Sequence, residues 1–406
     1  MRSLWNLRYP GHCIFVPSKP LRLRDCSEIP SAWSNTLKNS KMPGLQTTPH
    51  GRTSEHLLLQ ISLQVLPAKK FSLMLKPELQ NQIEVAAALL RKGGVVAIPT
   101  ETVYGLAADA SNADAVKRIF KIKGRPADHP LIVHIADESQ LEYWAREVPE
   151  SAKLLARQFW PGPLTLILPR SQHVSDMITG GQDSVGLRVP DHPVALALLR
   201  ALGSAIGLAA PSANRYGRIS PTTAQHVRDD LDESVDMILD GGPCQVGLES
   251  TIISCMGDTV TLLRPGGIPV TSIEAVLRHK VEVLDSTAAK IRVSGSLLSH
   301  YAPVTPLQLV AKEHLWQRAC ELEAQGLRVA TLEWSTPNEV HLPSTVHAGI
   351  VRTAMPANPV MYGQMLYATL RKLDNAQFDH LLAEAITETP DWQAVADRLK
   401  RASHRE

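Results

Sequence analysis

The stretch that decides the fold runs Gly93-Gly94-Val95-Val96-Ala97-Ile98-Pro99-Thr100-Glu101-Thr102-Val103-Tyr104-Gly105-Leu106-Ala107. The two glycines end a preceding helix, and the four apolar residues after them form a short buried strand. A polar turn, residues 99–107, follows that strand. Ligands of α/β sheets bind beyond the carboxyl ends of strands, so this turn is the first candidate for part of a binding site.

Strands and helices alternate outward from this stretch, which predicts an α/β domain over residues 77–280. Residues 281–305 are interpreted as a linker, and a smaller α/β pattern follows over residues 306–403. The expected helices span residues 79–92, 112–123, 137–145, 150–159, 193–202, 221–228, 271–277, 313–324, 359–373 and 392–401. The expected strands span residues 95–98, 131–135, 164–168, 185–189, 206–209, 237–239, 251–255, 259–263, 307–310 and 328–332.

The composition of the 406 residues is that of a globular protein, with 44% hydrophobic and 20% charged residues. No apolar run approaches the roughly 18 residues of a membrane span, so no membrane partner is expected. The five cysteines include no CxxC pair, which argues against a disulfide scaffold and a zinc site. A reducing compartment is therefore the natural setting, and we expect a cytoplasmic location.

Residues 1–73 differ in charge from the rest of the chain. They carry ten of the 42 Lys and Arg residues and three of the 40 acidic residues, so the remainder is mildly acidic. We interpret them as a disordered N-terminal extension, or as sequence upstream of a true start near Met74. A mitochondrial transit peptide is a second interpretation, although the amphipathic pattern is poor. A functional basic arm is the third.

Two polar clusters could bind an anion. Lys123 and Arg125 flank a glycine at the end of a helix, and Ser212 and Asn214 follow an apolar strand. Both arrangements suit a nucleotide phosphate. Taken alone, the first is explained as well by complementing the helix dipole, and the second by a helix cap or turn.

Two charged or titratable side chains lie inside apolar strands. Arg188 would be costly there unless it is paired, which implies a carboxylate ligand or a buried acid. His134, taken alone, is explained as well by a satisfied core histidine. The sequence contains no GxxxxGK[ST], no GxGxxG after the first strand, no GxSxG and no HExxH. Any nucleotide must therefore be bound by dispersed residues.

Taken together and in order, nine motifs closely resemble those of the YrdC/Sua5 family of threonylcarbamoyl-AMP synthases, over about residues 77–403. The part after residue 305 resembles the extra domain of the long, Sua5-type members. The motifs are Pro99-Thr-Glu-Thr-Val-Tyr-Gly-Leu106, Lys123-Gly-Arg-Pro126, His129-Pro-Leu-Ile-Val-His134, Trp160-Pro-Gly-Pro-Leu-Thr165, Leu187-Arg-Val-Pro190, Ala210-Pro-Ser-Ala-Asn214, Gly247-Leu-Glu-Ser-Thr-Ile252, Leu263-Arg-Pro-Gly266 and His300-Tyr-Ala-Pro303.

The resemblance implies a nucleotidyltransferase that makes L-threonylcarbamoyl-AMP and pyrophosphate from L-threonine, bicarbonate or CO₂, and ATP, with Mg²⁺ on the phosphates. The product would serve N6-threonylcarbamoyladenosine formation at position 37 of tRNAs that read ANN codons, through transferase partners that receive the adenylate. The implied fold is α/β, a YrdC-like twisted open sheet with a wide basic cavity, followed by a smaller Rossmann-like Sua5 domain. The linker between them would lie over the cavity.

The resemblance also implies residue roles. The nucleotide phosphates, and catalysis, would depend on Lys123, Arg125, Ser212 and Asn214. The ATP site would be completed by Thr179, Ser220 and Arg264, and closed by His300 and Tyr301. Threonine would be held by Thr100, Tyr104, His134, Arg188 and Ser250. No protein ligand to a metal is expected, and little packing is expected of Lys123 at its helix end.

Two features leave alternatives open. The segment Ser294-Gly-Ser-Leu-Leu-Ser-His300 replaces the family's usual Pro-Gly-Met-Lys-Tyr-Arg/Lys-His, which weakens the case that the linker contacts phosphate. Glu101 could orient the threonine ammonium or brace the turn, and we favour the brace.

Two other classes of function are alternatives to the enzyme. One is a module that binds tRNA or double-stranded RNA without catalysis, against which the mildly acidic body argues. Another is a carbamoyl-transfer domain of the hydrogenase-maturation type, but its acylphosphatase domain and zinc-finger cysteines are not visible in this sequence.

Overall fold

The computed structural model describes residues 5–9, 12–16, 75–257, 259–283, 291–295, 299–334, 348–387 and 389–404. The chain divides into two compact units, Met1–Ser72 and Leu73–Glu406. In the first unit, β1 (Trp5–Tyr9) and β2 (His12–Val16) form an antiparallel hairpin. The rest of the N-terminal extension lies outside the described residues, so its expected disorder stays a prediction. In the part of the chain that is described, no helix is long and apolar enough to cross a membrane.

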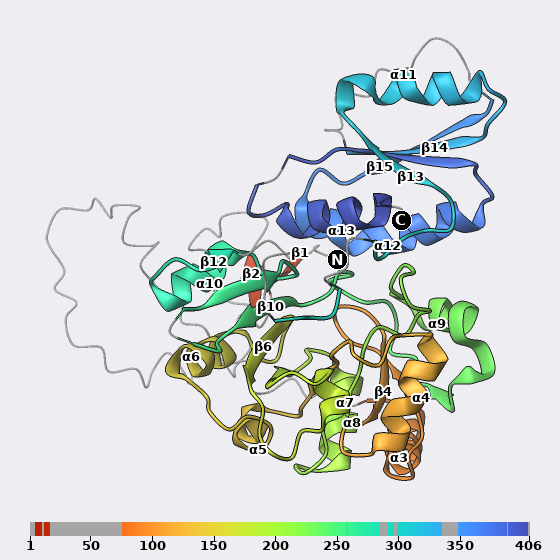
Figure 1. Cartoon of the computed structure of the whole chain (residues 1–406). Coiled ribbons are helices and arrows are strands. Elements are labelled where there is room, and N and C mark those ends of the chain that lie inside the picture. The colour runs from red at the N-terminus through yellow and green to blue at the C-terminus, as the bar shows by residue number, and fades with distance from the viewer. Residues whose placement is uncertain are drawn as a thin grey trace, which may run out of the picture. The chain divides into compact units, whose positions relative to one another are not determined.

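A ten-stranded mixed sheet forms the first part of the second unit (Figure 1). The parallel pairs β5–β7 and β6–β10 alternate with antiparallel pairs such as β6–β7 and β3–β4. In spatial order the strands are β12 (Glu282–Val283), β11 (Thr261–Arg264), β10 (Thr251–Ser254), β6 (Leu164–Pro169), β7 (Ser184–Arg188), β5 (Ile132–His134), β8 (Leu208–Ala209), β4 (Gly105–Asp109), β3 (Val96–Ile98) and β9 (Met237–Ile238).

Local sequence signals set the helix ends in this part. Asn112 accepts hydrogen bonds from the first free N–H groups of α4, and Gly124 ends that helix in the left-handed conformation at φ 64°. The helices are α3 (Pro77–Arg91), α4 (Ala113–Lys123), α5 (Leu141–Trp144), α6 (Glu150–Phe159), α7 (Asp176–Thr179), α8 (Pro193–Leu202), α9 (Ala224–Leu231) and α10 (Val270–Leu277), with 3₁₀ turns η2 (Glu138–Gln140) and η3 (Asp232–Ser234).

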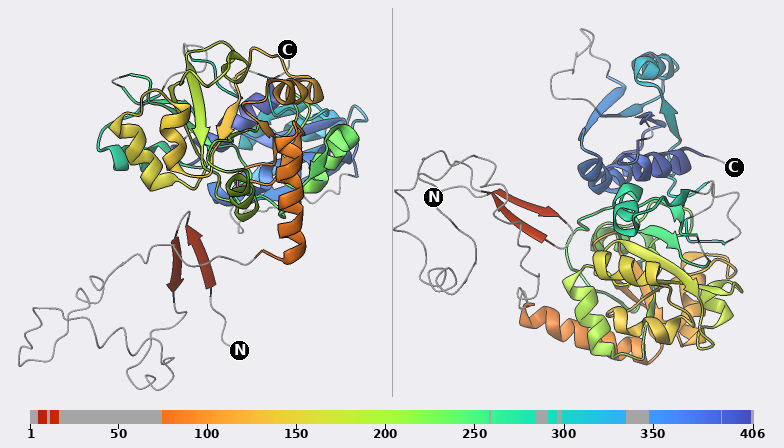
Figure 2. Two further views of the ribbon diagram at one scale, coloured as in Figure 1. Left: turned by 90° about the horizontal axis from the view of Figure 1, so that it is seen from below. Right: turned by 90° about the vertical axis from the view of Figure 1, so that its left-hand side faces the viewer.

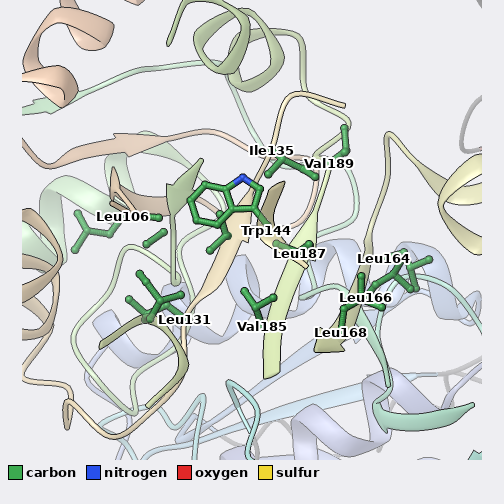
Figure 3. Close-up of a cluster of buried hydrophobic side chains, with 14 of the residues drawn as sticks. Leu106, Leu131, Ile135, Trp144, Leu164, Leu166, Leu168, Val185, Leu187 and Val189 are labelled. Atoms are coloured by element: carbon green, nitrogen blue, oxygen red, sulfur yellow. The ribbon is translucent and has the colours of Figure 1, made fainter. Parts of the chain in front are cut away.

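The main hydrophobic core lies between the sheet and its helices. Figure 3 shows the indole of Trp144 among aliphatic side chains from neighbouring strands, including Leu106 and Leu187. These side chains are fully buried, and burial of each aliphatic side chain contributes about 1.5–3 kcal/mol. The core thus fixes β4, β5 and β7, whose ends carry the polar residues of the site.

The second part is a four-stranded parallel sheet with helices on both faces (Figures 1 and 2). Helix α11 covers one face, and α12 and α13 lie on the other. The strands, in spatial order, are β13 (Leu307–Val310), β16 (His380–Glu384), β14 (Val329–Trp334) and β15 (Ile350–Met355), and the helices are α11 (Lys312–Glu323), α12 (Pro359–Asn375) and α13 (Gln393–Ser403). A twisted sheet domain followed by a smaller α/β domain was expected, and this fold class is confirmed.

Most expected elements are present within one to three residues of their predicted ends, but several are different. The expected turn 99–107 is shorter, because Gly105–Asp109 forms strand β4 antiparallel to β3. The expected helix 221–228 begins only at Ala224, because the Thr223 hydroxyl caps it by accepting from the His226 N–H. The expected helix 137–145 is a 3₁₀ turn followed by four helical residues. Strands β12, β15 and β16 were not expected.

Candidate active site

A small buried cavity lies where the expected motifs meet. Its volume is about 50 Å³, which leaves room for only a few water molecules. The lining residues come from the turn after β3, from β5 and β7, from the loops beside β8, β10 and β11, and from the linker. They are Thr100, Thr102, Val103, Gly105, Arg125, Ile132, His134, Arg188, Ala210, Pro211, Ser212, Glu249, Ser250, Arg264, Ser294, Gly295, His300 and Tyr301.

The turn after β3 supplies an acid for the arginine of β7. Arg188 forms a buried ion pair with Glu101 at 2.7 Å and donates to the Thr102 hydroxyl at 2.9 Å. The partner of the strand arginine is therefore a buried acid, one of the two possibilities raised by the sequence. The Nε of Arg188 has no hydrogen-bond partner within the described part of the chain, so one donor is left for a ligand.

Two more predicted threonine-binding residues line the cavity near Arg188. Thr100 braces its own turn, because its hydroxyl donates to the Val103 carbonyl at 2.6 Å and accepts from two backbone N–H groups. His134 is buried, and burial together with the charge of Arg188 lowers its pKa to about 3. The imidazole is therefore neutral at physiological pH and can donate or accept a hydrogen bond.

Lys123 and Arg125 are buried cations held by neutral groups. The Lys123 ammonium donates to the Ser212 and Asn214 carbonyl oxygens at 2.5 and 2.7 Å, and Arg125 donates to the Pro130 carbonyl at 2.9 Å. Burial, followed by the charge of Arg125, lowers the pKa of Lys123 well below its usual value. Only 3% of Lys123 is exposed, so the expectation of little packing there was wrong.

Arg264, at the end of β11, joins the loop before β10 to the linker. Its Nη2 donates to the Ser250 carbonyl at 2.8 Å and its Nη1 to the Ser294 carbonyl at 2.7 Å. The Ser294 hydroxyl donates to the Pro130 carbonyl at 2.9 Å and accepts from Arg125 at 3.2 Å. The linker therefore contacts both arginines of the predicted phosphate site, although it lacks the family's basic residue before His300.

The linker also places two aromatic residues in the cavity wall. His300 and Tyr301 are buried and lie edge to face, with ring centroids 4.1 Å apart. Tyr301 has φ 61°, a conformation unfavourable for residues other than glycine. Burial lowers the pKa of His300 to about 3, and burial raises the pKa of Tyr301.

Five residues predicted for the site are not among those that line the cavity. Lys123 is joined to the cavity wall through the Ser212 carbonyl and also donates to the Asn214 carbonyl, and the Asn214 amide donates to the Arg215 and Arg218 carbonyls. Ser220 donates to the Glu249 carboxylate at 2.6 Å. Tyr104 is in the core, where its hydroxyl donates to the Gly242 carbonyl at 2.7 Å, and burial raises its pKa. Thr179 is buried on α7, with its hydroxyl 3.4 Å from Arg170.

Glu249 lines the cavity but was not among the predicted site residues. Its carboxylate accepts hydrogen bonds from Ser220, from Tyr367 on α12 and from Arg398 on α13. The available signal was its place beside Ser250 in the motif 247–252. Two of its three partners, Tyr367 and Arg398, lie more than 100 residues away in sequence, so its environment could not be inferred.

Among the described residues, no three His, Cys, Asp or Glu side chains gather to hold a metal ion. The lining carboxylate, Glu249, is already occupied by three donors. A magnesium ion would therefore enter with the ATP phosphates as part of the substrate. Its presence stays a prediction.

Comparison with known proteins gives a consistent result. Residues 88–266 match the family described as "Telomere recombination" (Sua5, YciO and YrdC), and residues 268–404 match the threonylcarbamoyl-AMP synthase C-terminal domain. The chain is 45% identical to the threonylcarbamoyl-AMP synthase of Bacillus subtilis over 327 residues, which cover 79% of this chain and 93% of that relative. It is 36% identical to the Schizosaccharomyces pombe protein of the same name over 370 residues, covering 80% and 89% of the two chains.

A solved structure agrees with both domains. The crystal structure of Pyrococcus abyssi Sua5 complexed with L-threonine superposes with a TM-score of 0.73 at 38% identity. The match covers 80% of this chain and 94% of that chain. The likeness therefore extends beyond either domain alone.

Proposed function

The chain belongs to the YrdC/Sua5 family of threonylcarbamoyl-AMP synthases, and we propose that it makes L-threonylcarbamoyl-AMP and pyrophosphate from L-threonine, bicarbonate or CO₂, and ATP. The reaction is a nucleotidyl transfer. The product serves N6-threonylcarbamoyladenosine formation in tRNA, through a transferase that receives the adenylate. The cytoplasmic location expected from the cysteine pattern stays a prediction.

The observation that carries this proposal is a group of buried cations held by carbonyl oxygens. Arg125 and Arg264 line one cavity, and Lys123 is hydrogen-bonded to Ser212 of its wall. The hydrogen bonds described for the charged ends of these three residues go mainly to neutral backbone oxygens. Burial lowers the pKa of each of the three, which indicates that the positive charge is poorly solvated. A triphosphate would supply the missing negative charge.

The proposed chemistry needs positioning and charge neutralisation. The threonine amine becomes a carbamate, either by adding CO₂ and losing a proton or by condensing with bicarbonate and losing water. A carbamate oxygen then attacks the α-phosphate, and the bond from the α-phosphorus to the bridging oxygen breaks to release pyrophosphate. Both reactants are anions, so the buried cations lower the barrier by bringing them together and by stabilising charge on the phosphate. We propose that Lys123, Arg125 and Arg264 do this for the nucleotide.

We propose that threonine binds on the other side of the cavity. The unpartnered Nε of Arg188 is available for the amino-acid carboxylate, and Ser250 and His134 offer polar contacts to the rest of the molecule. No protein nucleophile is required. Cys244, the cysteine beside Thr100, is buried and its thiol pKa is raised by burial, so a covalent thioester there is not expected.

The substrates cannot enter the cavity as it stands. Ligand pockets usually enclose about 300–1,000 Å³, whereas this one has about 50 Å³. The residues between the cavity and the rest of the linker are Ser294, Gly295, His300 and Tyr301. The proposal therefore requires the cavity to widen when ATP binds.

The test is pyrophosphate release by the purified protein. Release should require ATP, L-threonine and bicarbonate together, and should be stimulated by Mg²⁺. Protein that binds ATP but releases no pyrophosphate with all substrates present would refute the enzyme. The alternative, an RNA-binding module, predicts instead that tRNA or double-stranded RNA binds with an affinity that threonine and ATP leave unchanged.

A further inference from the structure

Glu249 is the acidic residue among those that line the cavity in the described part of the chain. Its Oε1 accepts from the Ser220 hydroxyl at 2.6 Å. Its Oε2 accepts from the Tyr367 hydroxyl at 2.9 Å and from the Arg398 Nε at 2.7 Å. Tyr367 and Arg398 lie on α12 and α13, so two of the three donors come from the C-terminal domain.

Arg398 reaches the cavity wall from outside and is itself fully buried. Its Nη2 donates to the Pro265 carbonyl at 3.0 Å, and its Nη1 contacts Asp397. The guanidinium carbon lies 5.1 Å from the centre of the Tyr301 ring. Such a charge is costly to bury unless it is paired, and Glu249 and Asp397 provide the pairing.

The sign of the charge matters because, under the proposed function, this cavity receives ATP and a carbamate. An uncompensated carboxylate on its wall would repel both. Burial acts to raise the pKa of Glu249, but the charges of Arg398 and Arg264 outweigh it and lower that pKa to about 2. The carboxylate is therefore ionised, and Arg398 has the larger effect of the two compensating charges and is the one that donates a hydrogen bond to it. The other charged or titratable groups around Glu249 are Arg264, His300, Tyr301, Tyr367 and Asp397.

We propose that Arg398, a residue of the C-terminal domain, is a positioning residue for the active site, which neutralises Glu249 and turns its carboxylate away from the ATP phosphates. This inference rests on the proposed function. It gives the C-terminal domain a direct part in nucleotide binding through a contact between segments 149 residues apart in sequence.

The main test is the variant Arg398→Met at two pH values. At pH 8 Glu249 stays ionised without its partner, and the KM for ATP should rise on the order of tenfold. This factor corresponds to the repulsion between two like unit charges about 10 Å apart at an effective dielectric constant of about 20. At pH 6 Glu249 can take up a proton, and the rise should be smaller. The double variant Arg398→Met, Glu249→Gln removes the repelling charge and should return the KM to within about threefold of the wild-type value.

A matched control separates this effect from loss of domain contact. Arg371 on α12 forms a second ion pair between the two domains, with Asp230 at 2.6 Å, and does not touch Glu249. It also donates to the backbone carbonyls of Ile219 and Ser220, whereas the bond from Ser220 to Glu249 is made by the Ser220 hydroxyl. Arg371→Met should lower thermal stability as Arg398→Met does, without a pH-dependent change in the KM for ATP. The same pH-dependent rise in the control, or an unchanged KM in Arg398→Met at both pH values, would overturn the proposal.

Two further measurements keep the test decisive. If Arg398→Met does not fold, Tyr367→Phe can replace it, because it removes one donor to Glu249. This variant should raise the KM for ATP more at pH 8 than at pH 6, by a smaller factor than Arg398→Met. The affinity for ATP, measured by calorimetry without threonine, should be highest for the wild type, lower for Tyr367→Phe and lowest for Arg398→Met. Wild-type protein that binds ATP but forms no product would refute the proposed function, while the binding series alone would still decide the role of Arg398.

Discussion

Replacing Glu101 by Gln tests the buried ion pair that organises the turn after β3. The substitution keeps the shape of the side chain and removes its charge. Arg188 and Glu101 lie 2.7 Å apart with side-chain exposures of 5% and 4%, so the arginine would remain buried without a counter-ion. Removing one partner of such a pair typically costs about 3–5 kcal/mol, and the retained amide oxygen favours the lower value.

The assay is thermal unfolding with and without L-threonine. A loss of about 3 kcal/mol should lower the melting temperature by roughly 3–6 °C in a unit of this size. The control is Glu333→Gln, which breaks a partly exposed ion pair with Arg352 in the C-terminal domain. This substitution should lower the free energy of unfolding by about 1 kcal/mol or less. A melting temperature of Glu101→Gln as high as that of the control would refute the reasoning.

The same experiment separates the two roles considered for Glu101. If Glu101 braces the turn by pairing with Arg188, the threonine carboxylate can replace it, and threonine should stabilise the variant at least as much as the wild type. If Glu101 holds the threonine ammonium, threonine should lose its stabilising effect. The short distance to Arg188 favours the first outcome.

Three further outcomes follow from the site. Lys123→Ala should abolish pyrophosphate release, and normal turnover would contradict the phosphate role. The same variant should lower the free energy of unfolding, measured in urea, by about 1–3 kcal/mol, because two carbonyls lose their buried donor. Gly295→Ala should raise the KM for ATP, because the added Cβ would lie 2.1 Å from the Tyr301 hydroxyl and displace it, and because residue 295 has φ +79°, which strains alanine. Unchanged kinetics would contradict this. Since burial holds the pKa of His134 and of His300 at about 3, the unfolded chain binds more protons below pH 6.5. Stability should therefore fall by about 2 kcal/mol per histidine between pH 7.5 and pH 5, and His300→Asn should recover about half of the loss.

The helices could be predicted because their signals are local. Asn112 caps the start of α4 and Gly124 caps its end, and Gly93, at φ 82°, follows the C-cap of α3. Strand β4 was missed because Gly-Leu-Ala-Ala-Asp contains no β-branched or aromatic residue, and its pairing with β3 and β8 decides its conformation. Tertiary contacts thus override a weak local preference.

The candidate site shows the same division between local and distant information. The motif order led to the nine predicted residues that line the cavity, but not to what holds them. The sequence suggested that Arg188 must have an acidic partner or a carboxylate ligand, and burial physics alone justified that inference. It could not show that Lys123 is buried, because the loop that covers it, 211–214, lies about 90 residues further along the chain.

The charges around the cavity also suggest how the two substrates are told apart. Lys123, Arg125 and Arg264 are held mainly by carbonyl oxygens, so their region carries a net positive charge and suits the triphosphate. Arg188 is paired with Glu101, so its region is close to neutral and suits a zwitterionic amino acid, whose own charges sum to zero. A free phosphate would gain little beside the neutral pair, and the amino acid would leave the cations uncompensated. The carbamate, which adds one negative charge to threonine, should therefore be drawn from the neutral side toward the cations, where the α-phosphate lies in the proposed reaction.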